Sequence, residues 1–74
     1  MIIVYLTCGS DKEAKKIGKA LLEAKLVACV RRFEVQSNYW WDKKLEQNYE
    51  VMMIMESVEE KFDAINSIVA KMHS

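Results

Sequence analysis

The side chains of this sequence that are best suited to chemistry are soft metal ligands. They comprise two thiols, one imidazole and several thioethers: Cys8, Cys29, His73, Met52, Met53, Met55 and Met72. Thiolates and thioethers select Cu(I), and imidazole suits copper or zinc. No two of these residues have a spacing typical of a metal site, such as Cys-x-x-Cys, and Met53 and Met55 are simply explained as core residues on one strand face. The residue types therefore favour metal binding over other chemistry, but they leave the ligand set open.

Catalysis has weaker support in the sequence. No nucleophile with a base, pair of carboxylates or glycine-rich phosphate loop stands at a plausible spacing. A Cys8 or Cys29 nucleophile paired with His73 is conceivable, yet both cysteines lie in apolar runs where a thiol usually behaves as a small buried hydrophobe. We predict that the chain is not an enzyme.

Composition excludes several classes of partner. The 74 residues carry 11 basic and 11 acidic side chains, so the net charge of zero gives no electrostatic footprint for nucleic acid. The apolar run 1–8 is far shorter than the roughly 20 residues that cross a bilayer, and it lacks the features of a signal peptide. Two cysteines without dense, even spacing fit a reducing compartment. We predict a cytoplasmic protein with no nucleic-acid or membrane partner, folded as a single domain over residues 1–74.

A strand and two helices are predicted from local signals. Residues 2–8 form an apolar, β-branched run that indicates a buried central strand. Ser10 and Glu13 form a capping box ahead of an amphipathic helix that begins at residue 11. Ser57 and Glu60 form a second box, which predicts another helix running to the end of the chain.

Between these helices the sequence predicts a long β-hairpin. Alternation with period two runs over 26–41 and again over 45–56. The tight turn between them requires a positive φ at Asp42 or Lys43, where glycine is the usual residue. Acidic and basic side chains face each other across the two strands, which favours cross-strand ion pairs over a polar ligand pocket. They are Arg31, Arg32, Glu34, Glu46, Glu50 and Glu56.

The hairpin is too long for the helices that could cover it. A strand over 26–41 extends about 50 Å, whereas about 15 helical residues cover roughly 22 Å. Half of the hairpin should therefore overhang, and it carries an apolar and aromatic ribbon: Phe33, Val35, Tyr39, Trp40, Trp41 and Tyr49. Because such a ribbon marks a protein interface, we predict a homo-oligomer.

The predicted element order defines an α+β fold. Strand, helix, strand, strand and helix (β-α-β-β-α) follow one another, and an apolar strand, a capping box and a helix occur twice, as in the ferredoxin-like plan. The fourth strand of that plan is missing after the second helix. Either the chain is shortened, or another chain covers the open edge beside residues 2–8.

Several segments together resemble the CutA family of divalent-cation tolerance proteins. They are Leu-Val-Ala-Cys-Val at 26–30, Ser-Asn-Tyr-Trp-Trp at 37–41, Glu-Val at 50–51 and Met-His at 72–73, and the resemblance covers essentially all 74 residues. It implies a ferredoxin-like homotrimer held together by long hairpins, found in the cytoplasm or in organelles. It also implies a role in metal tolerance, with copper binding in some members.

The resemblance also implies where a site would lie. Polar and aromatic positions expected near the subunit boundary are Cys29, Tyr39, Trp41, Glu50 and His73. The resemblance and the soft ligands together favour Cys29 and His73 as metal ligands, with copper or another divalent cation as the cofactor. The function we predict is a metal-responsive trimeric binding protein.

The sequence departs from the family pattern at several positions. Arg31 stands where members usually have Asn, Lys43 where they have Gly, and Glu56 where they have Lys. Members also continue into a further strand and a C-terminal helix, so the chain resembles a shortened or engineered member. One alternative function is therefore a structural or engineered oligomerisation module that binds no ligand. Another is a sensor like the PII-type nitrogen-signalling trimers, which the absence of a basic or glycine-rich phosphate loop disfavours.

Overall fold

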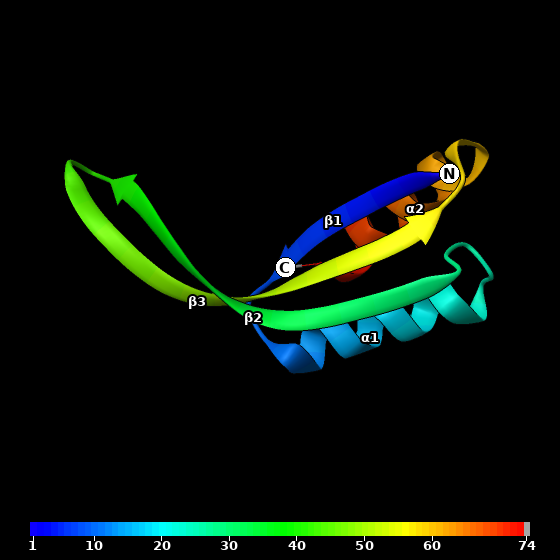
Figure 1. Ribbon diagram of the computed structural model, residues 1–74, viewed down its shortest axis with the longest axis horizontal. Helices are drawn as coiled ribbons and strands as arrows, with labels where there is room; N and C mark the ends of the chain where they lie inside the picture. Colours follow the sequence, from blue (N-terminus) through cyan, green and yellow to red (C-terminus); the bar gives the residue numbers. More distant parts are fainter. Residues whose placement is uncertain (74) are drawn as a thin grey trace.

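The computed structural model describes residues 1–73 as a three-stranded antiparallel sheet whose helices lie against one face (Figure 1). The elements in chain order are β1 (Ile2–Cys8), α1 (Asp11–Glu23), β2 (Cys29–Trp41), β3 (Lys44–Ser57), the 3-10 helix η1 (Glu59–Lys61) and α2 (Phe62–Met72). The predicted α+β class and the β-α-β-β-α order are confirmed.

The order of strands in the sheet is β1-β3-β2, so β3 is central and β1 lies at an edge. The prediction of a central, buried first strand is wrong. A ferredoxin-like first strand becomes central when a fourth strand pairs with its free side, and the sheet of residues 1–73 has three strands. Side chains of β1 accordingly alternate in exposure, and Tyr5 is 65% exposed on the face away from the helices.

The hydroxyl half of the first predicted capping box forms and starts α1, whereas the carboxylate half is made to Gly9 rather than to Ser10. Ser10 Oγ accepts a hydrogen bond of 3.1 Å from the Glu13 backbone N–H, and the Glu13 carboxylate accepts one of 3.2 Å from the Gly9 N–H. The helix then buries Ala14 and Ile17 against the sheet. The cap therefore holds the first turn of α1 close to the end of β1.

The second predicted capping box does not form. Ser57 is the buried last residue of β3, and its hydroxyl donates to the Leu26 carbonyl rather than capping a helix. A buried hydroxyl needs a partner, and this distant carbonyl provides one. The 3-10 turn η1 leads into α2 without a side-chain cap. Helix α2 ends at Met72, and the last residue of the predicted helix, residue 74, lies outside the described range.

The long hairpin is confirmed, and its far half extends beyond both helices (Figure 1). β2 begins at Cys29, three residues later than predicted. The chain leaves α1 through Lys25, which has a φ of 60°, and residues 26–28 form a link before the strand begins. At the tip both Asp42 and Lys43 have positive φ, 50° and 65°. Such angles at both central residues characterise the type I′ turn, whose twist matches that of the strands.

The hydrophobic core lies between the helices and one face of the sheet. Its buried residues are Cys8, Ala14, Ile17, Leu21, Val27, Val51, Met53, Met55 and Ile65. Alternation along the strands leaves the other face of the sheet uncovered within a single chain, with Ile3, Tyr5 and Phe33 exposed on it.

Candidate metal-binding site

Three potential metal ligands meet where β1 ends. The Sγ atom of Cys8, a carboxylate oxygen of Glu13 and a ring nitrogen of His73 all lie within 4.8 Å of one another. Cys8 is the last residue of β1, Glu13 is in the first turn of α1, and His73 directly follows α2. Within residues 1–73, these are the His, Cys, Asp and Glu side chains that gather in this way. We call them the Cys8 site.

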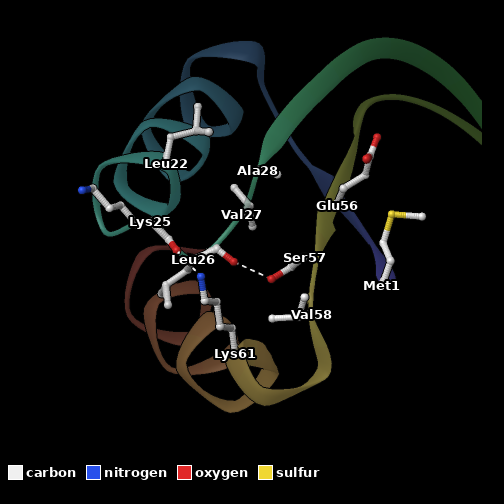
Figure 2. A pocket seen from close by; sticks show the side chains of 10 residues that line it. All are labelled: Met1, Leu22, Lys25, Leu26, Val27, Ala28, Glu56, Ser57, Val58 and Lys61. Carbon is white, nitrogen blue, oxygen red and sulfur yellow. Dashed lines mark hydrogen bonds between the residues drawn. The ribbon is translucent and has the colours of Figure 1, made fainter.

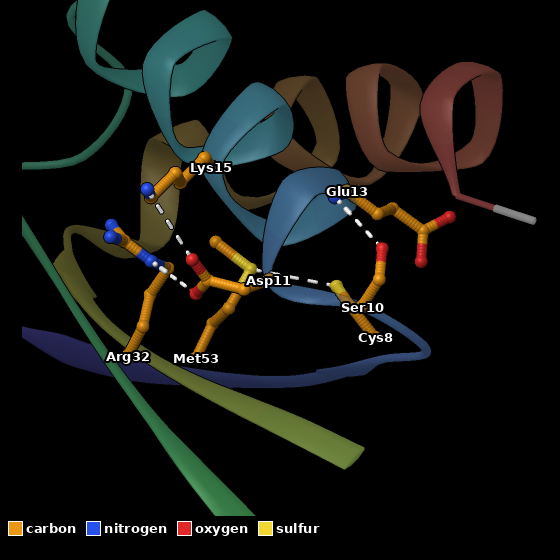
Figure 3. Close-up of polar contacts among 7 residues, drawn as sticks. All are labelled: Cys8, Ser10, Asp11, Glu13, Lys15, Arg32 and Met53. Atoms are coloured by element: carbon orange, nitrogen blue, oxygen red, sulfur yellow. Dashed lines mark hydrogen bonds and ion pairs between the residues drawn. The ribbon is translucent and has the colours of Figure 1, made fainter.

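Cys8 is the buried member of the Cys8 site. It is 1% exposed, and its thiol donates a weak hydrogen bond to Met53 Sδ across 3.7 Å (Figure 3). Burial raises the pKa of the Cys8 thiol, and the nearby Glu13 carboxylate raises it further. A metal ion that binds here must displace the thiol proton, so binding releases a proton.

Glu13 is positioned by the helix cap. Its bond from the Gly9 N–H and the cap at Ser10 place the carboxylate beside the last residue of β1 (Figure 3). Asp11, on the same turn, accepts from Arg32 Nε at 3.2 Å and pairs with Lys15 at 3.5 Å. The hydrogen bond from Arg32 is the main cause that holds the pKa of Asp11 below its usual range, and Lys15 lowers it further. The Arg32 contact also ties the first turn of α1 to β2. The first turn of α1 is thus fixed from two sides.

His73 is oriented by the backbone of β1. Its Nε2 atom lies 2.7 Å from the Thr7 carbonyl oxygen. Since a carbonyl can only accept, Nε2 is the donor, and a metal ion would bind at the other ring nitrogen, Nδ1. A histidine that donates one nitrogen to a backbone carbonyl and offers the other to a metal is the usual arrangement around metal ions.

The donor set suits a transition-metal ion. Thiolate, imidazole and carboxylate all bind Zn²⁺, and thiolate and imidazole also bind copper. Bonds of about 2.0 to 2.3 Å in a tetrahedral site place ligand atoms about 3.3 to 3.8 Å apart. The three atoms therefore need a small inward movement to share one ion. A buried thiol with a raised pKa is the opposite of a reactive cysteine, which argues against a catalytic Cys8–His73 pair.

Cys29, the other cysteine, lies away from the Cys8 site. Its thiol donates to Glu56 Oε2 at 3.4 Å and accepts from Arg31 Nη1 at 3.1 Å, while Arg31 and Glu56 form an ion pair at 2.7 Å. Cys29 pairs with Glu56 in the sheet, and the Thr7 that binds His73 pairs with Met52. These two positions on β3 are about 13 Å apart, so one chain brings His73 to Cys8 and not to Cys29.

The predicted interface residues all lie on β2 and β3. Trp40 and Trp41 are 74% and 69% exposed on the overhanging half, and Tyr49 is also exposed. Phe33 and Tyr39 are partly exposed, whereas Val35 and Glu50 are half-buried. Glu50 and Tyr49 line a hollow of about 240 Å³ near Asp11.

A cleft at the other end of β1 offers different chemistry. It has a volume of about 480 Å³, and the residues that line it include Met1, Leu22, Ser57 and Lys61 (Figure 2). Lys61 Nζ donates to the Lys25 carbonyl at 2.9 Å, so this amine caps the end of α1. The Lys61 amine that lines the cleft is therefore already engaged in a structural hydrogen bond.

The described residues include no helix long and apolar enough to span a membrane. Their β-α-β-β-α fold and the Cys8 site define a class of small α+β proteins with a group of side chains that could hold a metal ion. The family model for the CutA1 divalent ion tolerance protein matches residues 2–74, and the chain belongs to this family. The family name specifies tolerance to divalent ions and no reaction.

Individual relatives agree with this assignment. The divalent-cation tolerance protein CutA of Archaeoglobus fulgidus is 44% identical over 71 residues, which are 96% of this chain and 70% of that protein. The crystal structure of CutA1 from Pyrococcus horikoshii superposes with a TM-score of 0.90 at 33% identity, over 99% of this chain and 72% of the other. The structure of the Archaeoglobus fulgidus protein, described as periplasmic, gives 0.89 at 43% identity, over 97% and 71%.

Proposed function

We propose that the chain contributes to tolerance of a divalent metal by binding the ion at the Cys8 site, with copper as the expected metal. The observation that carries this proposal is the convergence of Cys8, Glu13 and His73 within 4.8 Å. Membership of a divalent ion tolerance family supports it. The Cys8 thiol is buried and its pKa is raised, so an ion can bind its sulfur only by replacing the proton. This environment favours metal binding over catalytic turnover.

The proposal includes a cytoplasmic homotrimer. The exposed aromatic side chains of the hairpin and the uncovered face of the sheet give a single chain apolar surface to bury against copies of itself. The interface would use these residues of the hairpin: Phe33, Val35, Tyr39, Trp40, Trp41, Tyr49 and Glu50. The predicted ligand pair of Cys29 and His73 would then form only across a subunit boundary.

A second candidate function is an assembly module that binds no metal. The observation that favours it is the hairpin itself, whose far half extends beyond both helices (Figure 1). Trp40 and Trp41, the last two residues of β2, are exposed. The contacts of Cys29 with Arg31 and Glu56 also satisfy that thiol without an ion.

Metal titration of the chain separates the two functions. We expect one Zn²⁺ or Cu²⁺ ion per chain, measured by calorimetry and by metal analysis after desalting. His73→Gln should weaken binding by about 10- to 100-fold or more, since even the loss of an outer partner of a ligand has that effect. Cys29→Ser is the matched control and should bind like the unmodified chain. Absence of uptake would support the assembly module, and loss of uptake in Cys29→Ser alone would overturn the Cys8 site.

A further inference from the structure

Met53 is a second buried sulfur in direct contact with Cys8. It lies in the C-terminal half of the central strand β3, paired with Leu6 on one side and Arg32 on the other, and it is 0% exposed. Its Sδ atom is 3.7 Å from Cys8 Sγ (Figure 3). The thioether therefore adjoins the Cys8 site, although its residue type alone indicates only a core position.

The separation of the two sulfur atoms is suited to a shared metal ion. Two sulfur ligands bound at about 2.3 Å are about 3.7 Å apart at tetrahedral corners and about 4.0 Å apart in a trigonal, three-ligand site. In the structure a weak hydrogen bond from the thiol of Cys8 joins the two sulfur atoms. Once an ion has displaced the thiol proton, Sγ and Sδ can both bind it with little change in their positions.

We propose that Met53 Sδ is a fourth ligand of the Cys8 site and that it directs the site toward monovalent copper. Thiolate and thioether are soft ligands that select Cu(I), while the harder Glu13 carboxylate suits divalent ions. The same site then has two ligand sets: Cys8, Met53 and His73 hold Cu(I), and Cys8, Glu13 and His73 hold Zn²⁺. This inference rests on the proposed function, because it requires that the Cys8 site binds metal.

Met55 provides a matched control within the same strand. It lies two positions further along β3, on the same face, and is equally buried. Its partner in β1 is Val4, so it lies further from the end of that strand than Met53 does. Methionine to leucine is a nearly volume-conserving change that usually costs less than about 1.5 kcal/mol in a core, so both variants should fold.

The test compares the affinities of Met53→Leu, Met55→Leu and the unmodified chain for two metals. Cu(I) is supplied from a bicinchoninate complex under anaerobic conditions, and Zn²⁺ is titrated by competition with a chromophoric chelator. We expect Met53→Leu to lose Cu(I) affinity by about tenfold or more, as thioether donors favour Cu(I), while its Zn²⁺ affinity stays unchanged. Met55→Leu should retain both affinities. Circular dichroism checks the fold of each variant.

The proposed function and the role of Met53 as a ligand would be contradicted by different results. If the unmodified chain takes up neither metal, the proposed function itself is wrong. If it binds both metals and Met53→Leu binds Cu(I) as tightly as the unmodified chain, Met53 is not a ligand and the inference is overturned while the proposed function stands. An equal loss of Cu(I) affinity in Met53→Leu and Met55→Leu would also overturn it, since that result reports core packing. X-ray absorption of the Cu(I)-loaded chain should show two sulfur ligands, and one sulfur in Met53→Leu.

Discussion

Replacing Lys43 by glycine should stabilise the chain, because the hairpin turn holds this residue at φ of 65°. An L-residue in this left-handed region costs roughly 1 to 2 kcal/mol, and glycine avoids that cost. Glycine loses more backbone entropy on folding, which costs roughly 0.5 to 1 kcal/mol. Subtracting the low end from the low end and the high end from the high end leaves a net gain of about 0.5 to 1 kcal/mol in the free energy of unfolding.

The assay is thermal unfolding at a fixed chain concentration, since the melting temperature of an oligomer depends on concentration. The expected gain corresponds to a rise of about 2 to 8 °C for a domain of this size. Lys44→Gly is the matched control, because it removes the same charge one residue later, at the first residue of β3. Glycine within a strand should destabilise by about 0.5 to 1 kcal/mol. Equal destabilisation by both variants would refute the argument from backbone conformation.

Three further predictions concern an ion pair, a buried hydroxyl and the hairpin. The Arg31 guanidinium, and then the Cys29 thiol, hold the pKa of Glu56 below its usual range. The ion pair therefore stabilises the fold above the ordinary carboxyl pKa of about 4.3, and this stability is lost as pH falls through the lower pKa of Glu56 in the folded state. Glu56→Gln should flatten the acid side of a plot of melting temperature against pH. Ser57→Ala should cost about 1 to 3 kcal/mol in chemical denaturation by leaving the partly buried Leu26 carbonyl without its hydroxyl partner, whereas an exposed α2 control, Ser67→Ala, should stay within about 0.5 kcal/mol. Trp40→Ser should weaken self-association in sedimentation equilibrium, and an unchanged association constant would contradict the role of the hairpin.

Local signals predict much of the fold. The hairpin, its strained turn and the start of α1 each depend on residues that are close in sequence, such as Ser10 and Glu13 in the cap. The incorrect predictions concern features that depend on residues far away in the sequence. The place of β1 at the edge depends on which strands pair with it, and Ser57 binds the carbonyl of Leu26, 31 residues away, in place of its own helix.

The same distinction applies to the candidate site. Cys8 and Glu13 are neighbours because the capping box joins β1 to α1, so their proximity is readable from the sequence. His73 reaches them only because α2 packs back along β1, and its contact with Thr7 spans 66 residues. The family resemblance favours Cys29 as the partner of His73, whereas the alternation of strand faces puts Cys29 on the uncovered side of the sheet and Cys8 in the core. No sequence spacing distinguishes those two thiols.

The central claim, that Cys8, Glu13 and His73 bind one metal ion, is tested most directly by anomalous diffraction from a crystal of the chain grown with Zn²⁺ and measured at the zinc edge. The account predicts an anomalous peak at about 2.3 Å from Cys8 Sγ and about 2.0 Å from a ring nitrogen of His73. A peak between Cys29 and Glu56 instead, or no peak near Cys8 in a crystal of the zinc-treated chain, would contradict it.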